Sequence, residues 1–487
     1  MGDHIPVLLV TANVGSIFEE PQTLLPGWIG AFLATVKKNQ PSFLALHCQE
    51  VGGKNYEKTM PHVADFIRAL VSSEELTNYM AVRVFLDEDF SCIEKFTALG
   101  NLYFVHQSLK NPQIWDFQEC RFLPVTGVEV HSGNIEKVLS KEKVKFPQEF
   151  FPECKWSRKG FMRTRWSLHG TVFDLINIHL FHDESNFIAM ESFPSLYTRN
   201  RQGALDYTLN RIQNDKYDKV PFFIFGDFNF RLDTQAVVEK ITRKAPPVQV
   251  KSGKNGDVTK VLFRDPKDEN RVVLTVERKV FSLQDHEEAF SRNNGKWAKH
   301  DREPSLFKDR LFEFDIAFPP SYPFKEDCSG ARSYMHTRCP AWCDRILLSK
   351  AARALVYTGT DESGKPPVTY QVMGADVCMG DHKKTVAFPP CCWRLEERLA
   401  RLDWGPNPAP KGGEGDTAFP VAARGPVLPH GPLGCRVERE TCRRGSGHPL
   451  HSGQGAWLSR SHLPRNDCLK TRFGRGRSAA SSVLHLG

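Results

Sequence analysis

The 487-residue chain has no apolar run that approaches the ~20 residues needed to cross a bilayer as a helix. Its first residues, MGDHIPVLLVTANV, have no basic segment ahead of the apolar run, which is unlike a secretory signal. Pro6 stands where a myristoylation signal has Ser or Thr, and the last residues, VLHLG, do not form a CaaX box for prenylation. We therefore expect neither a leader nor a lipid anchor.

Cysteine does not occur in a pattern typical of disulfides or of metal sites. There are 13 cysteines, an odd number, and they are scattered from Cys48 to Cys468. Disulfide frameworks belong to short secreted chains, so this usage favours a reducing, cytoplasmic setting. Cys339 and Cys343 are four residues apart, but no second pair at zinc-ligand spacing accompanies them. We expect no zinc site.

The first 388 residues lack an excess of either charge, with 50 basic residues against 49 acidic ones. The formal net charge of +8 comes almost wholly from residues 389–487, which hold 13 Arg and 2 Lys against 8 acidic residues. A domain that follows nucleic-acid phosphates usually carries a basic excess of its own. We expect no nucleic-acid partner, and at most a weak, salt-sensitive contact of the tail with anionic membranes.

The composition changes sharply at Pro389. Residues 389–487 contain 14 Gly and 11 Pro but only two of the 34 Phe, too little apolar surface to offset the entropy of ordering. We predict a folded domain over residues 1–388 and a disordered Gly/Pro/Arg-rich tail over 389–487. Within the domain, the polar, turn-rich segment 244–270 predicts a loop or an insertion.

The predicted domain alternates strand-like and helix-like segments. Apolar runs of strand length are Val7–Val14, Ser42–His47, Tyr79–Leu86, Leu99–His106, Phe161–Leu168, Thr171–Leu180, Phe222–Phe225 and Asp344–Leu348. Helical periodicity occurs in Trp28–Lys38, Val63–Val71, Leu196–Ile212 and Ala236–Thr242.

Polar side chains follow several of these apolar runs. In PFFIFGDFNFR, residues 221–231, Asp227 and Asn229 are two apart after a strand, so both should face the same site. Turn residues after a strand are also common without any function. However, the same pattern recurs in VLLVTAN, SFLALHCQE, FDLINIH and MGDHKK, with the polar residues Asn13, Gln49, Glu50, His179, Asp381 and His382. Their recurrence predicts one site along one edge of a sheet sandwich.

GDFNFR, PAWCDRIL and GDH occur in this order, and together they resemble the inositol polyphosphate 5-phosphatase family of the endonuclease/exonuclease/phosphatase superfamily. The resemblance covers roughly residues 5–385 and is greatest to the small type I enzymes. It implies an α+β fold, the DNase I-like four-layer α/β/β/α sandwich with two packed, mostly antiparallel sheets. It also implies an enzyme that depends on Mg²⁺ and removes the 5-phosphate of soluble inositol polyphosphates. We expect this enzyme to be monomeric and cytoplasmic. Its substrates would include inositol 1,4,5-trisphosphate and inositol 1,3,4,5-tetrakisphosphate, whose hydrolysis ends calcium-mobilising signals.

The resemblance also assigns roles to residues. Glu50 would ligate Mg²⁺, with Asn13 and Asp381 completing the shell around metal and phosphate. Asp227 would orient and deprotonate the attacking water, and Asn229 would bind the phosphate or the metal. The remaining catalytic groups would be His179 and His382, as donors to the phosphoryl oxygens, and Asp344, as the hydrogen-bond partner of His382. The substrate-binding candidates are the basic residues Lys159, Arg163, Arg345 and Lys350.

The sequence departs from the family pattern directly after the final Asp-His. Lys384 stands in a position that is usually Pro, and TVAFPP replaces an apolar strand. Relatives of type I are held at the plasma membrane by a prenyl anchor, for which this chain has no CaaX box. Two alternatives therefore stay open: a catalytically impaired variant that acts as a binding protein, and a nuclease or other phosphodiesterase of the same fold.

Overall fold

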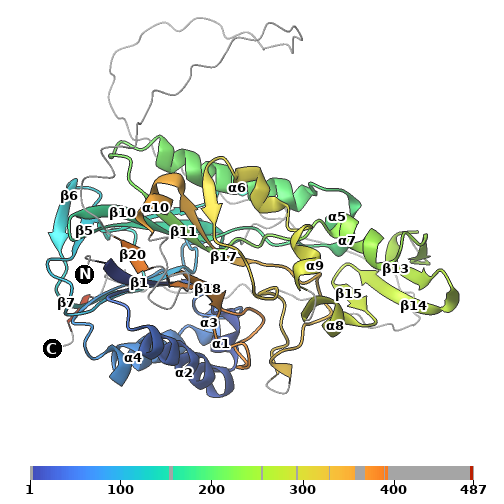
Figure 1. Ribbon diagram of the computed structural model, residues 1–487, viewed down its shortest axis with the longest axis horizontal. Coiled ribbons are helices and arrows are strands. Elements are labelled where there is room, and N and C mark those ends of the chain that lie inside the picture. Colours follow the sequence, from blue (N-terminus) through green and yellow to red (C-terminus); the bar gives the residue numbers. More distant parts are fainter. Residues whose placement is uncertain are drawn as a thin grey trace, which may run out of the picture. The chain divides into compact units, whose positions relative to one another are not determined.

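Two β-sheets pack face to face and carry the site. The computed structural model in Figure 1 describes residues 4–152, 157–253, 256–291, 294–327, 330–356, 368–388, 390–392 and 483–485. Rings from the two sheets meet between them, as when His47 stacks on Phe225 at 3.7 Å and Phe43 lies 5.1 Å from Trp166. This inter-sheet layer is the largest hydrophobic cluster in the described part of the chain.

The first sheet has nine strands among the described residues, in the order β18-β19-β1-β2-β4-β3-β7-β21, with β20 also pairing with β1. Its strands are β1 (His4–Asn13), β2 (Phe43–Gln49), β3 (Ala81–Leu86), β4 (Gly100–Val105), β7 (Gly127–His131), β18 (Thr369–Val372), β19 (Thr385–Phe388), β20 (Pro390–Cys392) and β21 (Val483–His485). Only β1/β2 and β3/β7 are parallel pairs.

In the part of the chain that the structure describes, the second sheet has eight strands, in the order β16-β17-β11-β10-β9-β5-β6, with β8 also pairing with β9. Its strands are β5 (Gln113–Asp116), β6 (Arg121–Pro124), β8 (Glu142–Lys145), β9 (Gly160–Leu168), β10 (Thr171–His179), β11 (Phe222–Asp227), β16 (Leu311–Glu313) and β17 (Asp344–Ser349). Here β10/β11 is the single parallel pair among those described, so both sheets are mostly antiparallel, as predicted.

Helices cover the outer face of each sheet. On the first sheet lie α1 (Gly15–Glu19), α2 (Pro21–Asn39), α3 (Tyr56–Thr59) and α4 (His62–Val71), and Figure 1 shows α2 and α4 below it. On the second sheet lies α6 (Leu196–Gln213), whose Leu205, Leu209 and Ile212 repeat at helical spacing and pack on Ile176 and Ile224. The layer order is therefore α/β/β/α, the predicted sandwich. No helix in the described ranges is long and apolar enough to cross a membrane.

The central strands are continuous apolar runs because both of their faces are buried. In β1, Val7 and Leu9 face the inter-sheet layer while Leu8 and Val10 face the helices. The remaining helices are α5 (Asn186–Glu191), α7 (Thr234–Ile241), α8 (His286–Ser291), α9 (Asn294–Ala298) and α10 (Lys350–Leu355).

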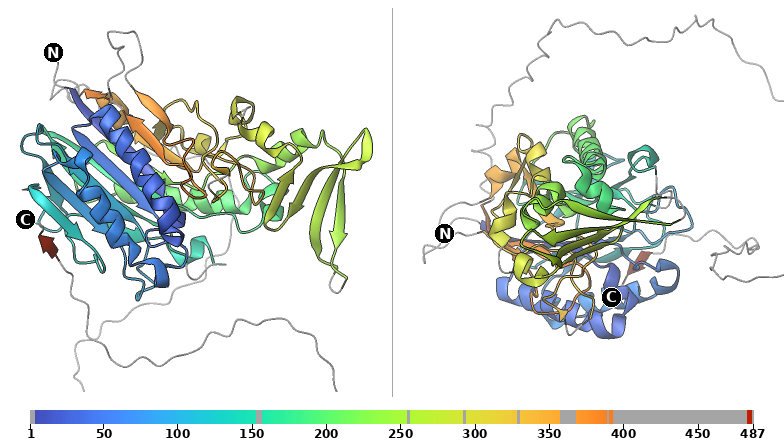
Figure 2. Two further views of the ribbon diagram at one scale, coloured as in Figure 1. Left: turned by 90° about the horizontal axis from the view of Figure 1, so that it is seen from below. Right: turned by 90° about the vertical axis from the view of Figure 1, so that its right-hand side faces the viewer.

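The segment 244–270, predicted to be a loop or an insertion, forms strands instead of a loop. A third, antiparallel sheet consists of β12 (Pro247–Lys251), β13 (Val258–Asp265), β14 (Asp268–Glu277) and β15 (Val280–Leu283). It lies beside α5 and α7, at the end of the two-sheet body opposite β6 (Figures 1 and 2). Val261 and Phe263 are buried, whereas their neighbours Lys260, Leu262 and Arg264 are partly exposed. One face of the strand is therefore buried, and the polar composition of the whole segment did not reveal it.

The unusual residues after His382 still complete the first sheet. Thr385 pairs with Thr11 of β1 on one side and with Val372 of β18 on the other. Lys384 is buried, its Nζ donates to the backbone oxygen of Trp28 at 2.8 Å, and burial holds the pKa of its amine well below the usual range. TVAF is therefore a working replacement for the apolar strand.

Two short pieces of the predicted tail pair with the first sheet. Residues 390–392 form β20 against β1, and residues 483–485 form β21 against β7. The prediction of disorder for the remainder of 389–487 concerns residues outside the described ranges and stays a prediction.

Candidate active site

The site lies at one shared edge of the two sheets because of how their strands run. The parallel pair β1/β2 brings Asn13 opposite Gln49, and the parallel pair β10/β11 brings His179 opposite Asp227. The strand β17 is antiparallel to β11, so its first residue, Asp344, lies opposite Asp227. The polar strand ends seen in the sequence therefore meet where the strands end.

Asp227 is the centre of the site, and its buried carboxylate is surrounded by donors. Its Oδ2 accepts hydrogen bonds from Asn13 Nδ2 (3.2 Å) and Asn229 Nδ2 (3.0 Å), and it lies 3.2 Å from His179 Nε2. Its Oδ1 accepts from the backbone N of Asn229 at 2.9 Å. Burial alone would raise its pKa, but the charge of His382 and the bond to His179 outweigh burial and hold the pKa far below its usual range. Asp227 is thus ionised in the resting site and accepts hydrogen bonds from its neighbours.

The glycine before Asp227 is required by the neighbouring strand. A Cβ on Gly226 would lie 1.9 Å from the carbonyl oxygen of Ile178 on β10, a distance that no side chain could occupy. This close approach to β10 brings Asp227 and His179 together.

His382 and Asp344 form a buried charged pair. His382 Nδ1 lies 2.9 Å from Asp344 Oδ2, and the hydroxyl of Ser321 donates to the same oxygen at 2.8 Å. Burial opposes a charge on His382, but the carboxylates of Asp344 and Asp227 outweigh it and raise the pKa of the imidazole to about 9. Burial raises the pKa of Asp344 to about 6, still below that of His382. At neutral pH the proton therefore stays on the imidazole.

Lys159 lies in the site, in contact with His179. Its Nζ touches His179 Nε2, and burial lowers the pKa of the amine to about 8 against the opposing charges of Glu50 and Asp227. Burial and the charge of Lys159 also lower the pKa of His179. A neutral imidazole and an ammonium group thus lie side by side next to the Asp227 carboxylate.

Glu50 and Asn13 offer oxygen ligands near one point. A Cβ on Gly15 would lie 2.7 Å from Glu50 Oε2 and 3.3 Å from Asn13 Oδ1. Burial raises the pKa of Glu50, but the charges of Arg158, Lys159 and His179 overcome it and lower the pKa to about 2. An ionised carboxylate beside an amide oxygen suits Mg²⁺, which prefers hard oxygen ligands. The residues present therefore fit the predicted metal.

Asp381, the third predicted metal ligand, has protein partners of its own. Its Oδ1 accepts from the hydroxyl of Ser16 at 2.9 Å, and its Oδ2 lies 3.5 Å from the ammonium of Lys54. Asp227, Asp344 and His382 also bring three possible ligand atoms within 4.8 Å of one another. A protonated imidazole cannot ligate a cation. We therefore interpret these three residues as the hydrogen-bonded pair His382–Asp344 with Asp227 beside it, and not as a metal site.

Arg163 does not reach the site, contrary to its predicted role in binding substrate. It pairs across β9/β10 with Ile176, whose side chain faces α6, while His179 faces the site. Its guanidinium contacts the carboxylates of Asp174, Glu142 and Asp215. Side-chain direction alternates along a strand, and the sequence does not show which face a residue takes.

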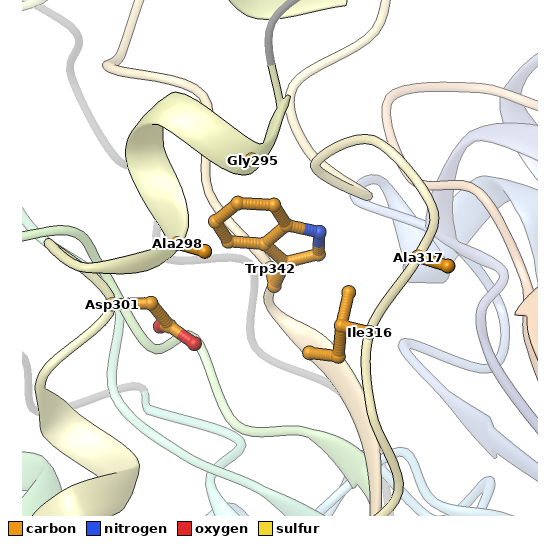
Figure 3. A pocket seen from close by; sticks show the side chains of 6 residues that line it. All are labelled: Gly295, Ala298, Asp301, Ile316, Ala317 and Trp342. Carbon is orange, nitrogen blue, oxygen red and sulfur yellow. The ribbon is translucent and has the colours of Figure 1, made fainter.

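Arg345 and Lys350 also lie away from the catalytic groups. Arg345 follows Asp344 in β17 and therefore points to the opposite face, where it pairs with Asp301 at 2.7 Å and Glu313 at 2.6 Å. Asp301 lies at the wall of a cavity of about 200 Å³ that is otherwise lined by Trp342, Ile316 and small residues (Figure 3). Lys350 begins α10, one residue after the far end of β17, and is exposed.

These placements predict that Arg163 contributes to stability and does not bind substrate. Arg163→Met should lower the free energy of unfolding by about 3–5 kcal/mol, because it removes the most buried of the cations that pair with these carboxylates and leaves them only Arg165 and Arg211. The KM of the folded protein should not change. Arg211→Met is the matched control, since Arg211 contacts the same Glu142 and Asp215 from a partly exposed position and should cost about 0–1 kcal/mol. Urea unfolding and steady-state kinetics measure both quantities, and a raised KM in Arg163→Met would restore the substrate role.

Sequence reasoning missed several residues that hold the catalytic groups. Arg231, the last residue of GDFNFR, donates to Asn229 Oδ1 at 2.7 Å and lies 4.5 Å from the centre of the Tyr322 ring. That ring lies 4.6 Å from the ring of His382. The motif itself pointed to Arg231, whereas Tyr322 lies in SYPF, a turn-like stretch without periodicity.

A buried polar network joins the two sheets beneath the site. Gln49 Nε2 donates to Asn177 Oδ1 at 2.8 Å, and Asn177 Nδ2 donates to the backbone oxygen of Cys48 at 3.0 Å. Gln49 and Asn177 are fully buried. Because buried amides are costly to leave unpaired, this network fixes how the two sheets are placed and hence how Asn13 and His179 face each other.

The α/β/β/α sandwich and a carboxylate surrounded by Asn, His and Lys define a phosphoesterase-like hydrolase. No protein-family model matches the chain. It is 50% identical over 378 residues to inositol polyphosphate-5-phosphatase A of Canis lupus familiaris and of Homo sapiens, which covers 77% of this chain and 91% of those proteins. It is 36% identical over 415 residues to the probable type I inositol 1,4,5-trisphosphate 5-phosphatase of Caenorhabditis elegans, covering 78% and 98%.

The chain belongs to the inositol polyphosphate 5-phosphatase family and is a phosphoric monoester hydrolase. A similar solved structure is the 5-phosphatase domain of synaptojanin with inositol (1,4)-bisphosphate and a calcium ion. It has a TM-score of 0.40 and 13% identity over 80% of this chain and 84% of that one.

Proposed function

We propose that the chain removes the 5-phosphate from soluble inositol polyphosphates in a Mg²⁺-dependent reaction, with the 1,4,5-trisphosphate and the 1,3,4,5-tetrakisphosphate as substrates. The observation that carries this proposal is the cluster around Asp227. A buried anion, a protonated His382 and the Lys159 ammonium surround one position, with the Glu50 and Asn13 oxygens beside it. Phosphomonoester hydrolysis needs such a combination of acceptor, cationic donors and metal ligands.

Each residue has a task that its surroundings support. Asp227 accepts a hydrogen bond from the attacking water and takes its proton as the bond to phosphorus forms. His382 and Lys159 donate to the phosphoryl oxygens, whose negative charge grows during the reaction. Asp344 keeps the proton on His382, and Arg231 orients Asn229 so that its Nδ2 faces Asp227. Mg²⁺, held by Glu50 and Asn13, would neutralise charge on the phosphoryl group.

The final strand supports an active enzyme over a catalytically impaired one. The impaired alternative arose because Lys384 and TVAF could have left His382 poorly held. In the structure β19 pairs on both sides, and the ring of His382 packs between Asp344 and Tyr322. A cytoplasmic, monomeric enzyme stays our expectation.

The test is the position and metal dependence of phosphate release. With inositol 1,4,5-trisphosphate and Mg²⁺, the product should be the 1,4-bisphosphate, identified by ion chromatography and phosphorus NMR. Excess EDTA should abolish release, and added Mg²⁺ should restore it. Undiminished activity in EDTA would contradict the role of the metal, and release from the 1- or 4-position would contradict the 5-phosphatase assignment.

A further inference from the structure

A turn of the third sheet lies beside the loop that follows His179. This turn joins β14 to β15 and consists of Arg278 and Lys279. Asn186 holds it in place with three hydrogen bonds: its backbone N donates to the oxygen of Arg278 (3.0 Å), and its Nδ2 donates to the carbonyls of Glu277 and Val280 that flank the turn (3.1 and 3.0 Å). The third sheet is thus fixed to the segment that carries His179.

Arg338 fixes the same turn from the other side. Its Nη2 donates to the backbone oxygen of Asp183 at 3.1 Å, and its Nη1 donates to the backbone oxygens of Thr337 (2.9 Å) and Arg278 (3.4 Å). Arg338 comes directly before the CPAWCD segment that ends in Asp344. The turn is therefore held between the two segments that carry His179 and Asp344.

The side chains of this turn carry excess positive charge toward solvent. The side chains of Arg278 and Lys279 are 66% and 65% exposed, and they share one carboxylate, Glu184, at 3.1 and 3.8 Å. Glu184 also lies 3.3 Å from His182 Nε2. Two permanent cations thus share one anion, while the buried Lys159 and Arg231 have no carboxylate within ion-pair distance in the described part of the chain.

Only a short stretch of chain separates Glu184, the anion that faces this turn, from His179 in the site. Glu184 is only five residues beyond His179, a segment that spans at most ~17 Å when fully extended. His182 lies between them in the chain, and burial together with the charge of Lys159 lowers the pKa of its imidazole. His182 is therefore neutral, and cationic groups lie on either side of it: Lys159 in the site, and Arg278 and Lys279 on the turn.

We propose that Arg278 and Lys279 bind a phosphate group of the substrate other than the one that is cleaved. The inference rests on the proposed function and adds to it a specificity site supplied by the third sheet. The planar guanidinium of Arg278 can bind a phosphate with two hydrogen bonds, and Lys279 adds a second charge. Exposed ion pairs are weak, so a phosphate dianion can displace Glu184 from both cations. Substrates with more phosphates gain most from the site.

The first arm of the test measures binding separately from turnover. In an Asp227→Asn background, which should bind without cleaving, Arg278→Ala/Lys279→Ala should weaken the binding of inositol 1,3,4,5-tetrakisphosphate roughly tenfold in calorimetry, the effect of one lost charge-assisted contact. Lys251→Ala/Lys267→Ala removes the same charge from exposed positions elsewhere on the third sheet and should not change the affinity. Glu184→Gln removes the competing anion and should tighten binding.

The second arm uses steady-state kinetics in the otherwise wild-type enzyme. The Arg278→Ala/Lys279→Ala variant should show a higher KM for the tetrakisphosphate with kcat unchanged, and a smaller change for inositol 4,5-bisphosphate. The site would be overturned if this variant and the Lys251→Ala/Lys267→Ala control bound the tetrakisphosphate with equal affinity. A fall in kcat with all substrates would overturn it too, and so would a lack of tetrakisphosphate binding by every protein in the first arm. If the wild-type protein bound the tetrakisphosphate more tightly than the Arg278→Ala/Lys279→Ala variant but released no phosphate from it, the site would be upheld and the proposed function overturned.

Discussion

Replacing Asp227 with Asn is expected to lower turnover by about 10²–10⁴-fold, the usual contribution of a general base or a charge-stabilising group. The carboxylate accepts from Asn13, Asn229 and His179 at the same time, and its low pKa keeps it ionised at every working pH. An Asn at this position keeps the shape but cannot take a proton from water. Its amide NH₂ would also face donors on at least one side.

The structural cost of this substitution must be measured beside the kinetics. Turning an NH₂ group toward a buried donor leaves one bond unmade, which costs about 1–3 kcal/mol, so thermal and urea unfolding should show a moderate loss of stability with a folded protein at 25 °C. Asp65→Asn is the matched control, because that carboxylate is exposed on α4 and pairs only with Arg68. A folded Asp227→Asn protein that keeps more than roughly a tenth of the turnover would show that Asp227 is not the base.

The sequence predicted the sandwich and the gathering of strand-end residues for the same physical reason. Strands buried on both faces are recognisable as uninterrupted apolar runs, and a polar residue directly after such a run marks where the strand leaves the core. Asn13, Glu50, His179 and Asp227 were all found in this way, and the structure brings them together. Their individual roles in catalysis stay predictions until the variants are measured.

Side-chain direction and long-range pairing could not be predicted in the same way. The basic residues of SRKGFMRTR are equally suitable by type, yet Lys159, just before β9, lies near Glu50, whereas Arg163, within β9, pairs with Asp174. Ser321 and Tyr322 contact the catalytic pair only because the chain returns to Asp344 and His382 from distant parts of the sequence. Such contacts follow from the register of strands and not from any local period.

The carboxylate of Asp344 keeps the imidazole of His382 protonated, and this pairing predicts how catalysis depends on pH. His382 is charged below its raised pKa of about 9 and loses its proton as the pH rises through that value. We expect kcat/KM of the wild-type enzyme to fall on the alkaline side as this proton is lost. In Asp344→Asn, burial acts on His382 with less opposing charge, so its pKa should fall and the alkaline decline should begin at a lower pH.

The loss of turnover in Asp344→Asn depends on how much of the positive charge on His382 is lost near pH 8. An imidazole that is mostly neutral at pH 8 is a weaker donor to the phosphoryl oxygens, so Asp344→Asn should lose about 10²-fold or more of its turnover at that pH. The loss should shrink at lower pH, where His382 regains its proton. His382→Ala should lose turnover at every pH, since no proton can restore the missing donor.

Lys159, with a pKa of about 8, titrates in the same range and must be separated from His382. The imidazole can be followed directly by NMR, with its signal assigned from its absence in His382→Ala. Ser321→Ala removes only the hydroxyl that donates to Asp344, so it should shift the imidazole pKa less than Asp344→Asn does. An alkaline decline that stays at the same pH in Asp344→Asn, with the imidazole pKa unchanged, would assign the decline to Lys159 and remove Asp344 from its role in keeping His382 charged.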